Sequence, residues 1–240
     1  MSKEFRSIYE KYLSVHLEYA QANEDWGMLK EIMAYLFLPH LPADKQAPIL
    51  EVGCGRGNFL KFLSEEGYQN FLGVDISPEA VGFCQRYITD RVLLIEDLQT
   101  FLREHRGQFE AIVMLDVLEH IPKAEVVSVG YCLREALTEG GRLIVKTLNA
   151  ANPWAWLLFG SDLTHEQIFS EISLREWCLS VGFSKVNLFP HNLPAKGLKR
   201  RLRLTGRSIV HKMYRLLWFF DYISLPITVF TPDIIVVATR

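Results

Sequence analysis

The sequence predicts an α/β fold with a mostly parallel seven-stranded sheet between layers of helices. Short apolar runs that read as buried strands alternate with helical segments from residue 48 to residue 148. Each strand, helix and following strand forms a right-handed crossover, and repeats of this unit give a doubly wound sheet. The 240 residues, 49% hydrophobic and 22% charged, suffice for one generous domain. Ligands are expected at the carboxyl ends of the strands.

The N-terminal half predicts the elements in a regular order. One or two helices are expected over residues 8–38, closed by Pro39 and Pro42. Gly140 and Gly141 predict a turn into a fifth strand. The five expected strands span 48–52, 70–75, 91–95, 109–115 and 142–148, and helices are expected over 58–66, from Pro78, and over 123–138.

The C-terminal half has a looser pattern. Residues 149–170 are rich in aromatic residues and turn formers, and Ser173 with Glu176 predicts a capped helix that ends at Gly182. Two last strands are expected over 185–189 and 234–239. Because 190–232 is too long for a hairpin loop, we expect a helical insertion before the last strand. The predicted organisation is a helical cap over residues 1–47 and one domain over 48–240.

Charge and cysteine usage exclude several classes of protein. The net charge of -2 provides no global field for nucleic acid, so no nucleic-acid partner is expected. The four cysteines are scattered and form no CxxC pair, as in a reduced, cytoplasmic protein without disulfides or a zinc site. The N-terminus is too charged for a signal peptide, and Asp221 and Pro226 interrupt the most apolar late stretch. We therefore expect a cytoplasmic protein.

A glycine-rich turn follows the first predicted strand. Gly53, Gly55 and Gly57 allow backbone angles that are closed to other residues and let a ligand approach the main chain. Asn58 stands where a dinucleotide-binding loop has its third glycine, which argues against NAD or FAD. Asp75 and Asp97 follow the next two strands, where they could bind ribose hydroxyls and an adenine amine or simply cap helices. A nucleoside ligand without phosphates fits this set.

Five ordered segments resemble the motifs of class I S-adenosylmethionine-dependent methyltransferases. They are ILEVGCGRGNFL, FLGVDIS, IEDLQTF, FEAIVMLDVLEHIP and LTEGGRLIVKT, within residues 48–189. The resemblance implies a Rossmann-like fold and S-adenosyl-L-methionine as cofactor. The residues that it places at the cofactor are Glu51, Gly53, Cys54, Gly55, Gly57, Asp75, Ile76, Asp97, Leu98, Leu115, Asp116 and His120.

Two clusters contain candidate catalytic groups. In the loop after the fifth strand, we expect His165 to act as a general base that is oriented by Asp162, although both could merely fasten the loop. Asp116, Glu119 and His120 form D-x-x-E-H, which is similar to the metal site of quinone-biosynthesis O-methyltransferases, with Asp in place of Glu. The segment V-L-E-H-I-P, which contains Glu119 and His120, also occurs widely in metal-free methyltransferases of this class, where the histidine closes over the cofactor. No metal is therefore expected.

The run N-P-W…D-L-T-H-E…F…S-L…W…G-F resembles small-molecule and sugar methyltransferases of bacterial surface-glycan pathways. It implies O-methylation of a small molecule or saccharide acceptor in cell-surface glycan biosynthesis. One alternative is a quinone or lipid O-methyltransferase with a divalent metal. The other is a non-catalytic scaffold, against which the intact glycine loop and its two aspartates argue.

The predicted insertion is strongly basic. Its segment 196–215 contains eight Lys and Arg residues and no acidic one, interleaved with apolar residues. Such a helix could lie on an anionic membrane surface, bind a phosphate-bearing acceptor, or pack on the core or a second subunit of a homodimer. Peripheral contact of residues 196–220 with the inner face of the membrane is the hypothesis that we retain.

Overall fold

The computed structural model describes residues 8–9, 14, 25–195, 197–221 and 227–240. Its seven-stranded sheet has the order β3-β2-β1-β4-β5-β7-β6. All neighbours are parallel except β7, which is antiparallel to both β5 and β6. The predicted fold class is confirmed. The strands are β1 (Ile49–Val52), β2 (Phe71–Asp75), β3 (Val92–Leu94), β4 (Phe109–Leu115), β5 (Leu137–Leu148), β6 (Lys185–Pro190) and β7 (Asp233–Thr239).

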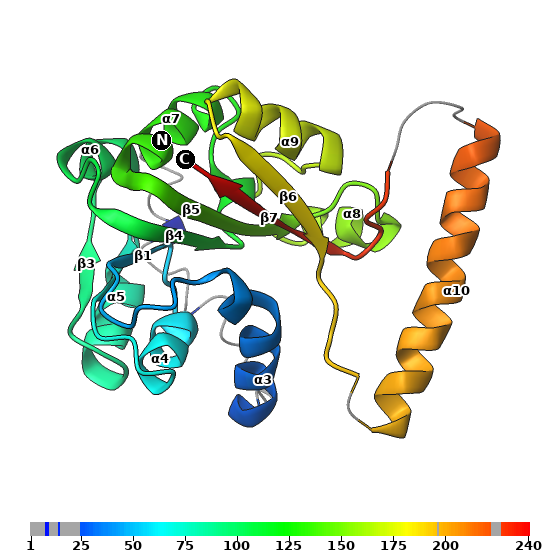
Figure 1. Cartoon of the computed structure of the whole chain (residues 1–240), viewed down its shortest axis with the longest axis horizontal. Coiled ribbons are helices and arrows are strands. Elements are labelled where there is room, and N and C mark those ends of the chain that lie inside the picture. Colours follow the sequence, from blue (N-terminus) through cyan, green and yellow to red (C-terminus); the bar gives the residue numbers. More distant parts are fainter. Residues whose placement is uncertain (1–7, 10–13, 15–24, 196, 222–226) are drawn as a thin grey trace.

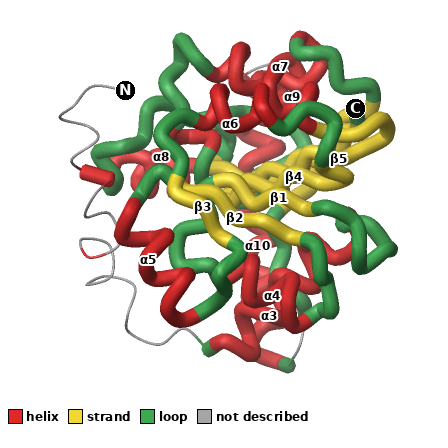
Figure 2. Tube along the Cα trace, turned by 90° about the vertical axis from the view of Figure 1, so that its left-hand side faces the viewer, coloured by secondary structure: helices red, strands yellow, loops and turns green. Residues whose placement is uncertain are grey.

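Helices cover both faces of the sheet (Figure 1). Helices α3, α4 and α5 lie on one face, and α6, α7 and α9 lie on the other, an arrangement that Figure 2 shows from the β3 edge. Their bounds are α3 (Trp26–Phe37), α4 (Asn58–Glu65), α5 (Pro78–Tyr87), α6 (Leu98–Glu104), α7 (Val126–Ala136), α8 (Pro153–Gly160), α9 (Glu171–Ser180) and α10 (Leu198–Asp221), with short 3-10 turns η1 (Leu38–His40) and η2 (Leu118–His120).

The alternation of the strands divides the core into two layers. Ala111 and Val113 of β4 pack with α3, α4 and α5, whereas Ile112 and Met114 pack with α6, α7 and α9. This is the period of two that a strand buried on both faces must have. Helix α3 contributes Met33, Leu36 and Phe37 to the first layer, so the described part of the N-terminal segment shares the core of the sheet.

Two short helices differ from the prediction. The segment before β4 contains α6, whose N-cap Asp97 accepts a hydrogen bond from the Thr100 amide. Within the expected loop after β5, Asn152 caps α8 and Pro153 occupies its first turn. The polar and turn-forming residues that predicted a loop here are thus a helix start.

Three boundaries also differ. Strand β5 begins at Leu137, which pairs with Phe109, and the register with β4 shifts before Arg142. Gly140, at φ +76°, therefore lies in an irregularity within the strand rather than in a turn that precedes it. The capping box of α9 is formed by Ser170 and Ser173, three residues before the pair that was predicted. Helix α7 begins at Val126 rather than at residue 123.

The predicted insertion contains one long helix. Helix α10 spans 24 residues and stands apart from the sheet, beyond β6 and β7 (Figure 1). Among the described helices, none combines the length and hydropathy needed to span a bilayer. The predicted helices before residue 25 fall largely outside the described residues.

Candidate functional site

The glycine turn between β1 and α4 combines close packing with an open face. Gly53, Gly55 and Gly57 have φ angles of +68°, +50° and +73°. A Cβ on Gly53 would lie 2.4 Å from Val117 Cγ2, and a Cβ on Gly57 would lie 2.8 Å from Cys84 Sγ. A Cβ on Gly55 would meet nothing within 4 Å. Gly53 and Gly57 therefore allow the turn to fold, and Gly55 presents its backbone to open space.

Asp75, at the end of β2, ties this turn to the sheet. Its carboxylate accepts hydrogen bonds from the Gly55 amide at 2.8 Å and from the Ser77 amide at 2.8 Å. Burial raises the pKa of Asp75, while these amides lower it. The side chain thus holds the turn in shape while it lines the cavity beside it.

A cavity of about 360 Å³ opens at the carboxyl ends of β1, β2 and β4, within the size range of small-ligand sites. It is lined by eight of the residues that the sequence assigned to the cofactor: Gly53, Gly55, Asp75, Ile76, Asp97, Leu98, Asp116 and His120. Tyr9, from the short described piece of the N-terminal segment, also lines it. We call it the first cavity.

A second cavity of about 400 Å³ lies across the glycine turn from the first. Gly53, Gly55 and Asp116 line both cavities. The second cavity receives three further predicted cofactor residues, Glu51, Cys54 and Leu115, together with apolar side chains of α3. Gly57 lines neither cavity, because its Cα faces Cys84 and Ile88.

Glu51 is a buried carboxylate with an unsatisfied oxygen. Its side chain is 3% exposed, and Oε2 has no hydrogen-bond partner among the described residues. Burial raises the pKa of Glu51 well above its ordinary value, with Cys84 and Asp75 adding to the effect. A buried carboxylate of this kind would be stabilised by a cationic ligand group in the second cavity.

Asp116 lies where the two cavities meet. It is the one non-glycine residue with positive φ, +57°, in the described part of the chain. Lys146 of β5 lies 2.5 Å away, from Nζ to Asp116 Oδ2. Burial opposes the charge of Lys146, but Asp116 and Asp233 raise its pKa above the ordinary value, so it is a cation. The Asp116 amide also donates to the Lys146 carbonyl oxygen at 2.9 Å, so Lys146 contacts both the backbone and the side chain of this residue.

The three groups of D-x-x-E-H have separate partners. Glu119 is 1% exposed and accepts a hydrogen bond from Thr147 Oγ1 at 2.8 Å. Burial and the charge of Asp116 raise its pKa to about 7. Its backbone carbonyl accepts from the amides of Glu166 and Gln167. Glu119 therefore fastens the loop after α8 rather than joining Asp116 and His120 in one cluster.

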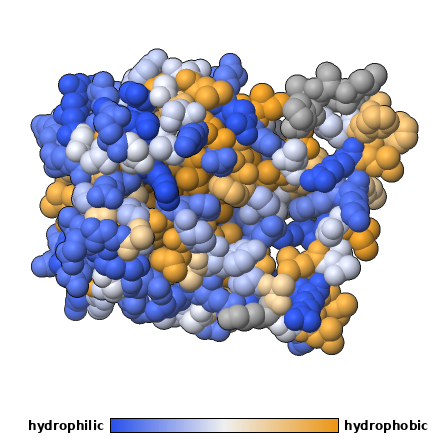
Figure 3. Space-filling model, viewed as in Figure 1, coloured by the Kyte–Doolittle hydropathy of each residue, from blue (hydrophilic) through white to orange (hydrophobic). Residues whose placement is uncertain are grey.

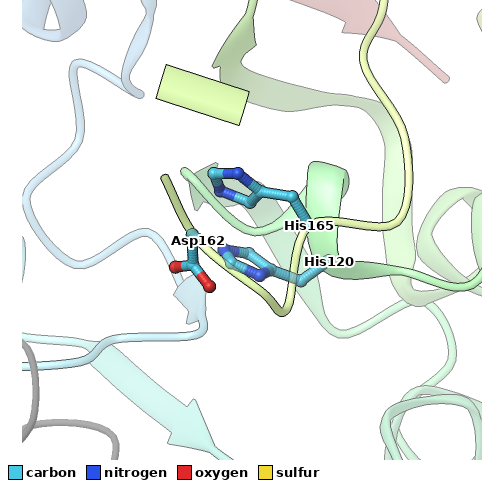
Figure 4. A group of neighbouring side chains, drawn as sticks. All are labelled: His120, Asp162 and His165. Carbon is cyan, nitrogen blue, oxygen red and sulfur yellow. The ribbon is translucent and has the colours of Figure 1, made fainter. Parts of the chain in front are cut away.

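His120 instead meets Asp162 and His165 (Figure 4). One donor atom of each residue lies within 4.8 Å of the other two, a spacing that could also hold a metal ion. His120 Nδ1 lies 2.8 Å from Thr164 Oγ1, which donates to Asp162 Oδ1 at 2.7 Å. The Asp162 carboxylate thus orients Thr164 and, through it, His120.

His165 is oriented by a different group from the one that was predicted. Its Nδ1 lies 3.0 Å from the carbonyl oxygen of Phe159, and its ring stacks on the Phe159 ring at an interplanar angle of 14°. Because a carbonyl only accepts, Nδ1 carries the proton and the lone pair is on Nε2. The ring centroid lies 4.7 Å from that of His120, beside the first cavity. This is the tautomer that a general base requires.

Comparison with known proteins identifies the family. A sequence family described as "Methyltransferase domain" matches residues 20–188. The chain belongs to this methyltransferase family. A ubiquinone biosynthesis O-methyltransferase of Xylella fastidiosa is 33% identical over 110 residues, which are 43% of this chain and 42% of that protein. A protein of the same name from Dechloromonas aromatica is 29% identical over 45% of this chain and 47% of its own. The chain spans less than half the length of these relatives.

Solved structures share the fold of this methyltransferase. A SAM-dependent methyltransferase from Archaeoglobus fulgidus superposes with a TM-score of 0.70 at 16% identity, covering 95% of this chain and 99% of its own. One from Mesorhizobium loti has a TM-score of 0.58 at 18% identity, covering 87% and 98%. These matches bear on the fold, because their sequences have diverged too far to compare individual site residues.

Three residues of the candidate site were missed from the sequence. Lys146 lies inside the apolar strand β5, and a lysine in a buried run is the signal that could have identified it. Thr164 connects Asp162 to His120 across 44 positions of sequence, which no local pattern reveals. Tyr9 approaches the first cavity from a segment that was predicted only as a helix.

Proposed function

We propose that this methyltransferase transfers a methyl group from S-adenosylmethionine to an oxygen atom of a small hydroxylated acceptor. The observation that carries the proposal is the pair of cavities that meet at the glycine turn, with one buried carboxylate on each side. Asp75 faces the first cavity and Glu51 the second. An elongated ligand with an adenosyl end and an ammonium end matches this division of groups.

The residues present fit such a donor. Asp75, Asp97 and Leu98 would hold the ribose and adenine in the first cavity, although Asp75 and Asp97 also bond nearby amides. The unsatisfied Oε2 of Glu51 would accept from the ammonium group in the second cavity. When bound, the donor supplies a methyl group on a sulfonium leaving group, so the protein mainly has to align the acceptor.

The acceptor proton would go to His165. An alcohol or phenol must lose its proton as the new C–O bond forms, and Nε2 of His165 has the lone pair to take it. The Phe159 carbonyl would stabilise the charged ring through Nδ1. His120, Tyr9 and Asp116 would form the wall against which the acceptor lies.

An acceptor of the quinone-precursor type, with a hydroxyl group on an aromatic ring, has the better support. It rests on the names of the relatives from Xylella fastidiosa and Dechloromonas aromatica. A saccharide in a surface-glycan pathway is the second candidate. It is favoured by Trp154 and Trp156, which are exposed on α8 and could stack on a sugar.

A transfer assay with radiolabelled methyl donor tests the proposal. Purified protein would be offered, in separate reactions, hydroxylated aromatic acids with and without a prenyl tail, the corresponding aromatic amines, and nucleotide-linked sugars. We expect label in the aromatic acceptor as an acid-stable methyl ether. Label confined to the sugars would favour the glycan candidate, and label on an amine acceptor alone would contradict O-methylation.

A further inference from the structure

We propose that α10 is an interfacial helix that docks the protein on an anionic lipid surface. The inference does not depend on which acceptor is methylated. It rests on three observations about α10: which face contacts the body of the protein, how the apolar residues repeat along the outer face, and how charge is distributed between them.

One narrow face of α10 contacts the rest of the protein. Arg207 donates to Asn192 Oδ1 at 2.6 Å, and Arg215 donates to the Thr228 carbonyl at 2.8 Å. The rings of His211 and Tyr214 each lie 6.2 Å from that of Phe230. These contacts fix the rotation of the helix about its own axis and determine which residues point outward.

The outward face is an apolar stripe. Its members are exposed by 51–74%, which is unusual for large apolar side chains that are grouped together. In the space-filling view, hydrophobic side chains gather along the helix at the edge of the molecule (Figure 3). We define the stripe as Leu198, Leu202, Ile209, Met213, Leu216 and Phe220.

The repeat of the stripe suits a flat surface. Leu198, Ile209 and Phe220 follow one another at intervals of eleven residues, as do Leu202 and Met213. Eleven residues make three turns of about 3.67 residues each, close to the 3.6 of a straight helix. The stripe therefore runs nearly parallel to the helix axis. Leu202, Ile209 and Leu216 also follow one another at intervals of seven residues, the repeat of a left-handed coiled coil, but a second copy packed on this stripe would bring basic borders of the same charge together.

The charges beside the stripe are positive. Exposed basic side chains flank it, among them Lys199 and Arg203 on one side and Arg201 and Lys212 on the other. The helix contains seven basic residues and one acidic residue, Asp221 at its end. An apolar face between two basic borders is complementary to the acyl boundary and the headgroups of an anionic bilayer.

Flotation with lipid vesicles tests the proposal on the full chain. We expect the protein to float with vesicles rich in phosphatidylglycerol, to remain behind with pure phosphatidylcholine, and to be released by salt. The variant Leu202→Asp with Leu216→Asp should bind the anionic vesicles about tenfold or more weakly, because both charges would enter the acyl boundary. Arg201→Gln with Lys212→Gln should weaken binding and reduce its salt dependence.

The matched control places the same charges on exposed apolar positions of α7 and α9. Val127→Asp with Leu179→Asp should float like the wild type. Affinity for S-adenosylhomocysteine should be the same for every variant, so a loss of flotation cannot come from misfolding. Wild-type protein that floats with neither vesicle would overturn the proposal. So would a dimer, seen by light scattering, that the Leu202→Asp and Leu216→Asp changes dissociate while vesicle binding persists.

Discussion

Two histidines beside the first cavity are both held at Nδ1 by a backbone carbonyl oxygen, that of Phe159 for His165 and that of Thr164 for His120. His120 Nδ1 also contacts the Thr164 hydroxyl, which is itself bonded to Asp162. Burial and the neighbouring His165 lower the pKa of His120, which favours the neutral form of its ring. The proposed base is thus accompanied by a second ring whose neutral form burial favours.

Replacing His165 tests the proposed base. His165→Ala should lower kcat by about a hundredfold to ten-thousandfold, because the acceptor would keep its proton during transfer. The affinity for S-adenosylhomocysteine should not change, since His165 does not line the first cavity. Glu166→Gln, next to it in the same loop and exposed, is the control that should retain activity. Full activity of His165→Ala with the true acceptor would remove this residue from the mechanism.

The same variant separates acid–base chemistry from metal chemistry. If His120, Asp162 and His165 bind a divalent cation instead, chelation of the wild-type enzyme should abolish turnover and added cation should restore it. We expect turnover to survive chelation. A chelator-sensitive enzyme that binds one equivalent of metal, and loses it in His165→Ala, would assign the cluster to metal binding.

Glu119 makes stability depend on pH. In the folded protein the pKa of Glu119 is about 7, above the ordinary 4.5. The protonated side chain therefore contributes to the free energy of unfolding in full below pH 4.5, and this contribution is lost as pH rises through 7. Glu119→Gln cannot ionise, so the variant should gain stability relative to the wild type between pH 4.5 and pH 8, by about 3 kcal/mol. Denaturant titrations at both pH values measure this difference. The exposed Glu139→Gln is the control for the loss of a carboxylate at the surface.

At the scale of single elements, two glycines of the turn between β1 and α4 have different roles, one in folding and one in ligand binding. A Cβ at position 53 would clash with Val117, whereas a Cβ at position 55 would meet no atom within 4 Å. Both have positive φ, so a side chain is strained at either position. Substitution of Gly53 should therefore mainly lower stability, and substitution of Gly55 should mainly lower ligand affinity.

Alanine at each position tests this distinction. Gly53→Ala should lower the free energy of unfolding by roughly 2–4 kcal/mol, through backbone strain and the contact with Val117. Gly55→Ala should cost about 1 kcal/mol of stability from strain alone, yet bind S-adenosylhomocysteine at least about tenfold more weakly. Gly82→Ala, within α5 and facing no atom within 4 Å, should be neutral or stabilising. Unchanged ligand affinity in Gly55→Ala would contradict the proposed placement of the donor.

The strands at the centre of the sheet were predictable because burial on both faces leaves a continuous apolar run. The predicted bounds of β4, residues 109–115, agree with the structure. Helices α6 and α8 were not predicted, because α6 has only 7 residues and the polar start of α8 is typical of a turn as well as of a helix cap. The bulge in β5 follows from its pairing with β4, which the sequence of one strand does not contain.

The candidate site was predictable where its residues directly follow a strand in the sequence. The glycine turn and the aspartates after β2 and β3 come directly from the order of strands, and all three line the first cavity. The partners of Asp162 and His165 were not predictable, because Thr164, Phe159 and His120 meet through the folding of a loop. Likewise, Asp116 and Lys146 come together only when β4 pairs with β5.

At the scale of the whole molecule, the proposed donor would connect parts of the chain that are distant in sequence. The first cavity joins β1, β2, β4, the start of α6 and Tyr9. The second adds α3 and His191, whose pKa burial and Lys146 lower to about 4, so that it binds Asp233 as a neutral ring. A ligand that bridges these elements should stabilise the folded chain as a unit.

Thermal unfolding measures this linkage. S-adenosylhomocysteine at a hundredfold excess over its Kd should add about 2.7 kcal/mol and raise Tm by roughly 5–10 °C. Adenosine, which lacks the ammonium end that Glu51 would bind, should give a smaller shift at the same concentration. Equal shifts for the two compounds would argue against a role for the second cavity in binding.

Calorimetric titration of the wild-type chain with S-adenosylmethionine tests the central claim most directly. We expect one ligand per chain with a Kd below a millimolar, competition by S-adenosylhomocysteine, and strongly weakened binding in Gly55→Ala. Folded protein that takes up neither compound at millimolar concentration would contradict the account.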